Sequence, residues 1–414
     1  MHYVFKGIRN IKVYKPWIIN NFMEEAIIDK LILNSIKQIK WVGQFKNKRY
    51  LFKQVKSIDK EYFIGIKGFR GIGKTVLMLQ LAKETKDSVY FSADSTILKQ
   101  FSLYEIIKEL SKRDFRNIFI DEIHRKTGWD VDIKTIYDEH EIRIIFSGSS
   151  ALDITRTSAD LSRRAVLKEL KPVSFREFLN IRKEYNIQEI TFNEILKNKN
   201  SLIKDYSEIF EHFEEYLEYG GVLYQKNGFT DALENSIRKV ILQDLSALRD
   251  INIKYETDIY KLLYLVARSP PFEVNYSSIS RELEISKTFS IKIIRDLESS
   301  GLIIPIFPCR KIGIDVVKEP KIYLTIPLRK FFLKQGVEIN KGSLREEFFV
   351  NHIREVCYLK GERGEKTPDF KFKDTIIEIG GASKTNYQKP DYIATDSLST
   401  ESNKIPLFLF GLIY

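Results

Sequence analysis

The residues with the clearest chemistry form a glycine-rich run from Gly68 to Thr75, which reads GFRGIGKT. Glycines at this spacing let backbone N–H groups point toward phosphate oxygens. A lysine at the position of Lys74 reaches the β- and γ-phosphates of a nucleotide, and a hydroxyl at the position of Thr75 holds Mg²⁺. The spacing therefore predicts a site for ATP and Mg²⁺, with nucleotide contacts from Gly68, Phe69, Arg70, Gly71, Ile72, Gly73, Lys74, Thr75 and Val76.

Two carboxylates, Asp121 and Glu122, follow the apolar run Ile118–Ile120. In P-loop NTPases an aspartate at the end of such a strand holds Mg²⁺, so Asp121 is expected to bind the metal together with Thr75. A glutamate that follows can polarise the attacking water, which makes Glu122 and Lys74 the candidate catalytic residues. The pair predicts hydrolysis of ATP, whereas acidic residues that only aid solubility are the alternative interpretation.

Polar residues also end the next apolar run, where Ser147 and Ser149 are candidates for contact with the γ-phosphate. Arg163 and Arg164 follow in a pattern that indicates a helix. Either arginine can approach a phosphate as an arginine finger, and a surface pair is an equal alternative.

These residues must be positioned by the elements around them. Four short apolar runs alternate with helical patterns, at Tyr62–Ile66, Val89–Phe91, Ile118–Ile120 and Ile142–Phe146. Continuous apolar strands that alternate with helices predict an α/β fold with a parallel sheet covered on both faces. After residue 160 nearly every segment up to about residue 250 has a helical pattern, which predicts a helical lid.

The sequence resembles the prokaryotic AAA+ family of P-loop ATPases that carry a winged-helix segment and a restriction-endonuclease-like C-terminal domain. The resemblance rests on Gly68–Thr75, Phe119–Ile123, Phe146–Ser150, Leu161–Arg164, Pro172–Leu179 and Tyr219–Gly221. It implies four parts: basic N-terminal helices and a P-loop core (1–160), a helical lid (161–250), a winged helix (251–335) and a nuclease-like domain (336–414). Three helical patterns between Ile259 and Glu298, followed by two strand patterns, agree with the winged helix.

The tail resembles the PD-(D/E)xK nuclease pattern through Asp369 and Glu378. Two such carboxylates bind Mg²⁺ in these nucleases, and a lysine positions water. The lysine position holds Gly380 here, and Lys384 would have to reach in from the next segment. Glu347, on the preceding helix, is a candidate third acidic contact. A catalytically silent nuclease fold is therefore favoured over an active one.

Composition sets the remaining expectations. The formal charge is +11, and the first sixty residues hold thirteen Lys and Arg against four Asp and Glu. Such an excess can attract DNA, although dispersed lysines are also typical of a solvated surface. No apolar run is long enough for a membrane span. The two cysteines, Cys309 and Cys357, lie far apart, so neither a disulfide nor a zinc site is expected and a cytoplasmic location fits.

Three functions remain open. The first is an AAA+ ATPase that uses ATP and Mg²⁺ to drive a conformational switch on a partner, either DNA bound by the basic N-terminus or winged helix, or a protein. The second is an ATP-regulated DNA nuclease, and the third is a non-catalytic adaptor that binds ATP.

Overall fold

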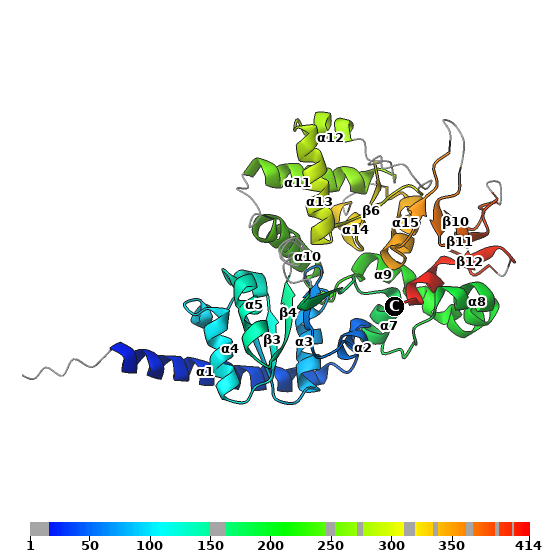
Figure 1. Cartoon of the computed structure of the whole chain (residues 1–414). Coiled ribbons are helices and arrows are strands. Elements are labelled where there is room, and N and C mark those ends of the chain that lie inside the picture. Colours follow the sequence, from blue (N-terminus) through cyan, green and yellow to red (C-terminus); the bar gives the residue numbers. More distant parts are fainter. Residues whose placement is uncertain are drawn as a thin grey trace, which may run out of the picture. The chain divides into compact units, whose positions relative to one another are not determined.

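The computed structural model describes residues 16–148, 163–245, 253–270, 276–309, 319–333, 338–361, 367–385, 389–399 and 401–414 (Figure 1). The chain divides into two compact units. One takes in Met1–Gln44 and Met78–Phe146, and the other takes in Phe45–Leu77 and Ser147–Tyr414. The glycine loop therefore belongs to the second unit, whereas the acidic pair that follows Ile120 belongs to the first.

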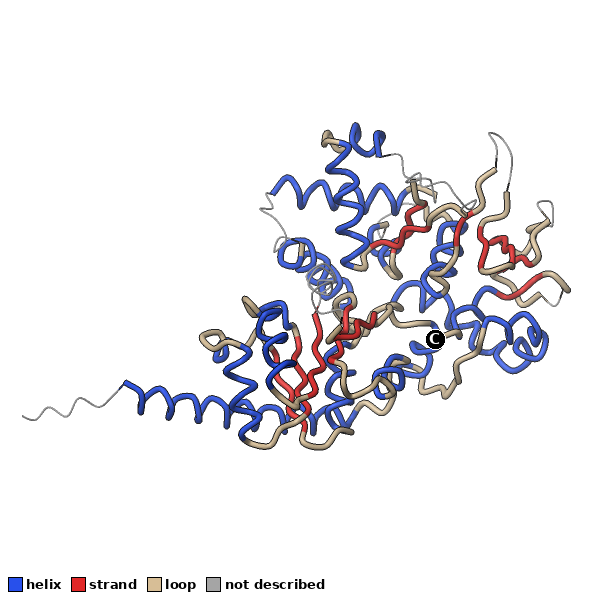
Figure 2. The backbone as a smooth tube through the Cα atoms, in the orientation of Figure 1, coloured by secondary structure: helices blue, strands red, loops and turns tan. Residues whose placement is uncertain are grey.

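The first sheet has the strand order β2-β3-β4-β1-β5, and its strands are drawn as red tubes in Figure 2. The pairs β2–β3, β3–β4 and β1–β5 are parallel. The strands are β1 (Phe63–Lys67), β2 (Ser88–Ser92), β3 (Asn117–Asp121), β4 (Arg143–Gly148) and β5 (Ala165–Glu169). The α/β prediction is confirmed, and β1 to β4 lie on the four apolar runs, because their central residues are buried as a parallel sheet requires.

Strand β5 contradicts the prediction of a helix in this segment. It pairs in parallel with β1, with Phe63 opposite Ala165. Its side chains are half-buried or exposed, and apolar and charged residues alternate in it too irregularly to identify an edge strand from the sequence. Arg163 and Arg164 consequently lie in the turn before this strand and not in a helix.

The first unit places helices beside β2, β3 and β4. They are α1 (Pro16–Trp41), α4 (Leu103–Lys112), α5 (Trp129–Glu139) and the short η1 (Val42–Gln44), η2 (Thr96–Leu98) and η3 (Ile123–Arg125). Helix α1 packs on β2, where the hydroxyl of Ser35 accepts the N–H of Tyr90 at 2.8 Å. Although α1 has 26 residues, no helix in the described part of the chain combines the length and apolar character needed to cross a membrane.

Helix α3 (Lys74–Lys83) begins inside the glycine loop. The second unit continues with α2 (Leu51–Lys56), α7 (Phe175–Arg182), α8 (Phe192–Tyr206), η4 (Ser207–His212), α9 (Phe213–Tyr219), α10 (Phe229–Lys239) and η5 (Val240–Asp244). Then come α11 (Ile253–Arg268), α12 (Tyr276–Glu282), α13 (Lys287–Ser300), the antiparallel strands β6 (Ile303–Ile306) and β7 (Lys321–Leu324), and α14 (Leu328–Phe332). Three helices followed by a strand pair are the predicted order, and their identification as a winged helix stays a prediction, as does the four-part division of the chain.

A second sheet follows α15 (Lys341–His352) and has the order β12-β11-β10-β9-β8. Its strands are β8 (Cys357–Tyr358), β9 (Phe370–Phe372), β10 (Thr375–Gly380), β11 (Tyr392–Thr395) and β12 (Lys404–Pro406). Strand β9 is antiparallel to β8 and β10, while β11 is parallel to β10 and β12. The apolar run after β12 forms the 3₁₀ turn η7 (Leu407–Leu412), although a short buried apolar run of this kind is equally typical of a strand.

Helices α7 to α9 share one apolar core with α15 and the second sheet. Rings meet across it: Phe175 lies 6.4 Å from Phe348, and Phe210 lies 5.7 Å from Phe408. Helices α7 to α9 therefore bury their apolar faces against residues that lie more than a hundred positions later in the sequence.

The expectation about the cysteines was wrong, since Cys309 and Cys357 form a disulfide. Their backbones are brought together by pairing of the segment after β6 with β8. Tyr358 donates its N–H to the carbonyl of Phe307 at 3.0 Å and accepts the N–H of Cys309 at 2.9 Å. A separation of 48 residues in sequence carries no sign of this pairing.

Candidate functional site

The glycine loop connects β1 to the first turn of α3, which is the local structure that its sequence predicts. Gly71 and Gly73 have φ values of +81° and +94°, which side-chain-bearing residues rarely adopt. The buried ammonium group of Lys74 donates to the carbonyls of Gly68 at 2.8 Å and Phe69 at 3.0 Å. Thr75, in the first turn of α3, is exposed. Backbone N–H groups at a helix N-terminus, a lysine and a hydroxyl are thus gathered in eight residues, a set that suits a phosphate with its metal.

Residues outside the motif hold the loop from its outer side. Leu223 donates its N–H to the carbonyl of Gly71 at 2.8 Å, and the guanidinium of Arg49 donates to the carbonyl of Ile72. The ring of Tyr224 lies against Gly71, and its hydroxyl is 2.5 Å from the hydroxyl of Ser236. The sequence reasoning missed these contacts because the residues lie far from the motif along the chain.

Alanine at position 71 is expected to weaken nucleotide binding at least tenfold, because a Cβ there would meet the Tyr224 ring at 2.2 Å and the left-handed φ would be strained. Tyr224 would have to move and lose its partner Ser236. The dissociation constant is measured by titrating Mg–ATP against a bound fluorescent nucleotide and following the loss of its signal.

Gly228→Ala is the matched control, since Gly228 has a φ of +74° and no heavy atom within 4 Å of its added Cβ. Both substitutions add the same backbone strain, but only Gly71→Ala disturbs the loop. Equal dissociation constants for the two variants would contradict the prediction.

The acidic strand end lies in the first unit. The carboxylate of Asp121 is buried, with 4% of the residue exposed. One oxygen accepts the hydroxyl of Tyr90 at 2.9 Å and the other accepts the N–H of Glu122 at 3.2 Å. Burial, and then the charge of Asp121, raise the pKa of Tyr90 well above its ordinary value, so its hydroxyl stays a donor. Tyr90 thus fixes the orientation of the carboxylate, a role that its position in an apolar strand does not reveal.

Glu122 has a left-handed backbone, with φ +53° and ψ +43°. Its carboxylate lies 3.4 Å from Nε2 of His124, and 18% of its side chain is exposed. Strand β3 ends at Asp121, and the left-handed turn at Glu122 gives the Glu122 side chain a direction that it would not have in a continued strand. His124, to which no role was assigned from the sequence, is therefore a direct neighbour of the candidate base.

Of the remaining candidates near the core, Ser147 lies in β4 and is buried. Ser149 lies outside the described residues. Arg163 is exposed and Arg164 accepts the N–H of Phe63 through its carbonyl at 2.9 Å, which registers β5 on β1.

The second sheet gathers three carboxylates and one lysine. Asp369 precedes β9 and accepts the N–H of Ile379 at 2.7 Å, Glu378 lies in β10, and Glu346 lies in α15. Burial, and then the charge of Asp369, raise the pKa of Glu346 to about 8. Burial also raises the pKa of Asp369 and of Glu378. Among the described residues no three His, Cys, Asp or Glu side chains stand close enough to hold a metal ion in this geometry.

Lys384 occupies the space that the absent motif lysine would take. Its ammonium pairs with Glu378, and its Cβ and Cγ would lie 2.6 Å from a Cβ built on Gly380. Burial acts to lower the pKa of Lys384, but the hydrogen bond to Glu378 and the nearby carboxylates raise it. A side chain at position 380 would therefore collide with Lys384, and the glycine leaves room for Lys384 to reach Glu378.

Glu347 does not join this group. Its carboxylate pairs with the buried guanidinium of Arg329, with Nε–Oε2 and Nη2–Oε1 distances of 2.8 Å, and accepts the N–H of Leu324 at 2.9 Å. Adjacent residues on a helix point in different directions, so Glu346, and not Glu347, shares the environment of Asp369. The expectation that Glu347 would face the carboxylates of the second sheet was therefore wrong, because its side chain is bound to Arg329.

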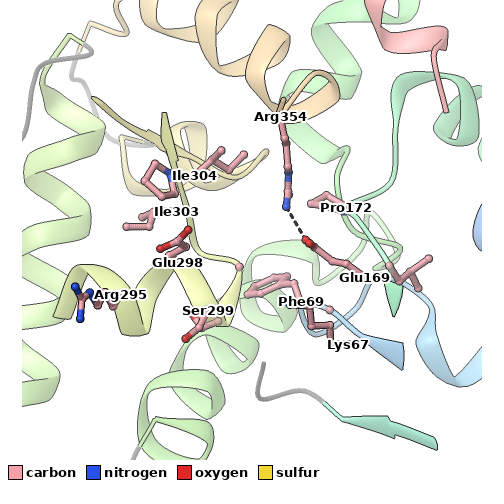
Figure 3. Close-up of a pocket in the computed structure, with 15 residues that line it drawn as sticks. Lys67, Phe69, Glu169, Pro172, Arg295, Glu298, Ser299, Ile303, Ile304 and Arg354 are labelled. Atoms are coloured by element: carbon pink, nitrogen blue, oxygen red, sulfur yellow. Dashed lines mark hydrogen bonds and ion pairs between the residues drawn. The ribbon is translucent and has the colours of Figure 1, made fainter. Parts of the chain in front are cut away.

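A cavity of about 500 Å³ opens beside the first residues of the glycine loop. Figure 3 shows its walls, to which Lys67 and Phe69 contribute together with Arg295 and Glu298 of α13. Arg354 and Glu169 close one side with an ion pair of 2.6 Å. The volume suits a small ligand. Because both segments line the cavity, the start of the glycine loop lies close to α13, the third helix of the α11–α13 segment.

Similarity to solved structures is loose. ORC1 of Aeropyrum pernix, solved in complex with DNA, is 12% identical, with a TM-score of 0.27, over 73% of this chain and 92% of that chain. AMPPCP-bound DnaA of Aquifex aeolicus is 18% identical, with a TM-score of 0.25, over 60% of this chain and 86% of that chain. At these TM-scores neither match bears on function.

Sequence relatives cover most of the chain. Residues 60–179 match a family model described as an AAA domain. Uncharacterized protein MJ1544 of Methanocaldococcus jannaschii is 28% identical over 370 residues, which are 82% of this chain and 75% of that protein. Uncharacterized protein MJ1637 of the same organism is 30% identical over 369 residues, which are 80% of this chain and 78% of that protein. The chain therefore belongs to the family of MJ1637 and carries an AAA domain at residues 60–179.

Proposed function

We propose that the protein binds and hydrolyses ATP with Mg²⁺. The observation that carries this proposal is the geometry of the glycine loop, in which two left-handed glycines precede Lys74 at the N-terminus of α3. Lys74 would bind the β- and γ-phosphates and Thr75 would bind the metal. The match of residues 60–179 to an AAA domain supports the nucleotide as ATP.

Asp121 would hold Mg²⁺ and Glu122 would activate water. The buried carboxylate of Asp121, oriented by Tyr90, suits a hard cation that needs a fixed oxygen ligand. Glu122 would take the proton of the attacking water, and His124 lies beside its carboxylate. Ser147 would contact the γ-phosphate from the end of β4.

The hydrolysis cycle would drive a switch that acts on a partner. Contact between the loop and the α11–α13 segment supports this step, because a Cβ on Gly301 at the end of α13 would lie 3.4 Å from the Cβ of Phe69. We infer that α11–α13 with β6 and β7 is a winged helix that moves with the loop, and that the lid lies within residues 161–250, which include α10. DNA and a protein remain the two candidate partners, and the basic N-terminal segment favours testing DNA first.

ATP turnover in the presence and absence of single- and double-stranded DNA tests this function. Glu122→Gln is expected to lower turnover about a hundredfold while ATP binding is kept, because the amide cannot accept the proton. Glu139→Gln, at the end of α5, is the control. Turnover that survives Glu122→Gln would remove Glu122 from its role, and stimulation by DNA would identify DNA as the partner.

A second candidate function is a metal-dependent nuclease in the second sheet. The observation that favours it is the position of Lys384, which restores a lysine beside Glu378 where the motif alone has Gly380. Asp369 and Glu378 would bind Mg²⁺ after a small movement of their side chains. Such a movement is needed because, among the described residues, no three acidic, His or Cys side chains are close enough to bind one metal ion. Lys384 would then orient the water.

Nicking of supercoiled DNA at several Mg²⁺ concentrations tests this activity. Asp369→Ala and Lys384→Met are each expected to reduce it at least a hundredfold, whereas Lys373→Met in the turn before β10 should leave it unchanged. Absence of metal-dependent nicking by the unmodified protein, with and without ATP, would show that the fold is catalytically silent.

A further inference from the structure

Arg49, just before α2, is a buried arginine at the outer side of the glycine loop, with 4% of the residue exposed. Its guanidinium donates to the carbonyls of Ile72, of Lys171 at 2.7 Å and of Pro172 at 3.3 Å. Its Nε lies 2.9 Å from a carboxylate oxygen of Glu177 in α7. One planar cation thus connects the loop, the chain after β5 and the first turn of α7, and a lysine has too few fixed donors to do the same.

The contact with Ile72 bears on phosphate binding through the geometry of the peptide unit. In a trans peptide the C=O and the next N–H point in opposite directions. When Arg49 binds the carbonyl of Ile72, the N–H of Gly73 is directed away from Arg49, toward the inner side of the loop. The hydrogen bond from Leu223 to the carbonyl of Gly71 orients the N–H of Ile72 in the same manner. Outer hydrogen bonds therefore preset the inner donors that a phosphate would use.

Glu177 makes this arrangement depend on α7. It is the third residue of a capping box: its carboxylate accepts the N–H of Ser174 at 3.3 Å, and its own N–H is bound by the hydroxyl of Ser174 at 3.2 Å. The carboxylate also accepts the N–H of Tyr50 at 2.7 Å. The same charge that neutralises Arg49 thereby fixes the start of α7 and the residue after Arg49.

Hydrogen bonds continue from α7 to α15. Phe175 donates its N–H to Nε2 of His352 at 3.1 Å, and Nδ1 of His352 lies 2.7 Å from the carbonyl of Phe348, which can only accept. The ring is therefore neutral, and burial lowers the pKa of His352 to about 3. The hydroxyl of Ser174 donates to the main-chain oxygen of Tyr414, whose own hydroxyl lies 3.1 Å from the carbonyl of Pro172.

We propose that the Arg49–Glu177 pair is a positioning element of the nucleotide site, which presets the N–H groups of the loop and ties the loop to α15. The proposal rests on ATP binding at Gly68–Thr75. A bound nucleotide would accept hydrogen bonds from N–H groups of the loop, and Arg49 binds the carbonyl on the opposite side of one of the same peptide units. Any change in the loop is then passed to Glu177, to the start of α7 and to His352, close in sequence to the acidic residue Glu346.

The test compares the dissociation constant for Mg–ATP in four full-length proteins. Arg49→Lys is expected to raise it roughly tenfold, because it keeps the charge but loses the fork that reaches Ile72. Glu177→Gln loses the charge and leaves a single acceptor oxygen for the N–H groups of Ser174 and Tyr50. It serves as the second variant if Arg49→Lys does not fold. Arg329→Lys is the matched control, since Arg329 is equally buried and equally paired with a glutamate but has no contact with the loop.

Two readouts separate positioning from simple stabilisation. Both arginine variants should lower the thermal midpoint, but only Arg49→Lys should weaken nucleotide binding by the folded protein. Saturating Mg–ATP is also expected to slow hydrogen exchange at the amide of Phe175 in the unmodified protein, and to have no such effect in Arg49→Lys.

Failure of the unmodified protein to bind ATP would overturn the proposed function and this inference with it. ATP binding within about twofold of the unmodified protein in both Arg49→Lys and Glu177→Gln would overturn the inference alone. A hydrogen-exchange rate at the amide of Phe175 that is the same with and without Mg–ATP would refute the connection to α15.

Discussion

Replacing Lys74 by alanine is expected to weaken Mg–ATP binding about a hundredfold or more, because the proposed charge-assisted contact to two phosphates would be lost at a buried position. The ammonium of Lys74 now donates to the carbonyls of Gly68 and Phe69, so it is already held at the loop.

Titration with Mg–ATP measures this loss, and Lys83→Ala is its control because Lys83 ends the same helix and is exposed. The control should bind as the unmodified protein does. Equal binding by Lys74→Ala would place the nucleotide somewhere other than the glycine loop.

Replacing Glu347 by alanine is expected to lower the free energy of unfolding by about 3–5 kcal/mol, because the charge of Arg329 would stay buried without its partner. Both side chains are 2% exposed, and the guanidinium also holds the carbonyls of Ala267 and Ser269 at the end of α11. A loss of this size is a large part of the total stability of a typical domain. Urea unfolding, followed by circular dichroism, gives the change in midpoint.

The double variant Arg329→Met/Glu347→Met separates the buried charge from the packing. Removing both charges is expected to recover most of the lost stability, because an apolar pair needs no solvation. A double variant that is less stable than Glu347→Ala would show that the hydrogen bonds to Ala267 and Leu324, and not the unpaired charge, dominate.

The parts of the site that were predictable from the sequence depend on short spacing. Gly68, Lys74 and Thr75 lie within one loop, so their relative positions follow from a local backbone pattern. The strands β1 to β4 were predictable because a mainly apolar run of three to five residues is enough to mark a buried parallel strand. The place of Asp121 and Glu122 at the end of β3 was predictable for the same reason, as they follow one of those runs.

The parts that were missed depend on contacts between distant segments. Arg49, Leu223 and Tyr224 reach the loop from outside the motif, and their residue types alone do not mark them as its neighbours. Lys384 lies four residues beyond the expected position, and its reach toward Glu378 depends on a turn of the backbone that spacing alone cannot give. The spacing of the motif thus predicts the local structure of the loop, whereas the residues that hold the loop from outside the motif come from distant segments.

The shared core of α7–α9 with the second sheet also constrains how the chain can fold while it is being made. Residues such as Phe175 and Phe210 leave the ribosome well before Phe348 and Phe408, which complete their packing. At ordinary rates of synthesis the interval is on the order of 10 s, far longer than a helix needs to form. During that interval the apolar face of α7–α9 has no partner, so the emerging chain is exposed to aggregation at this point, and chaperones that bind apolar helices would engage it there.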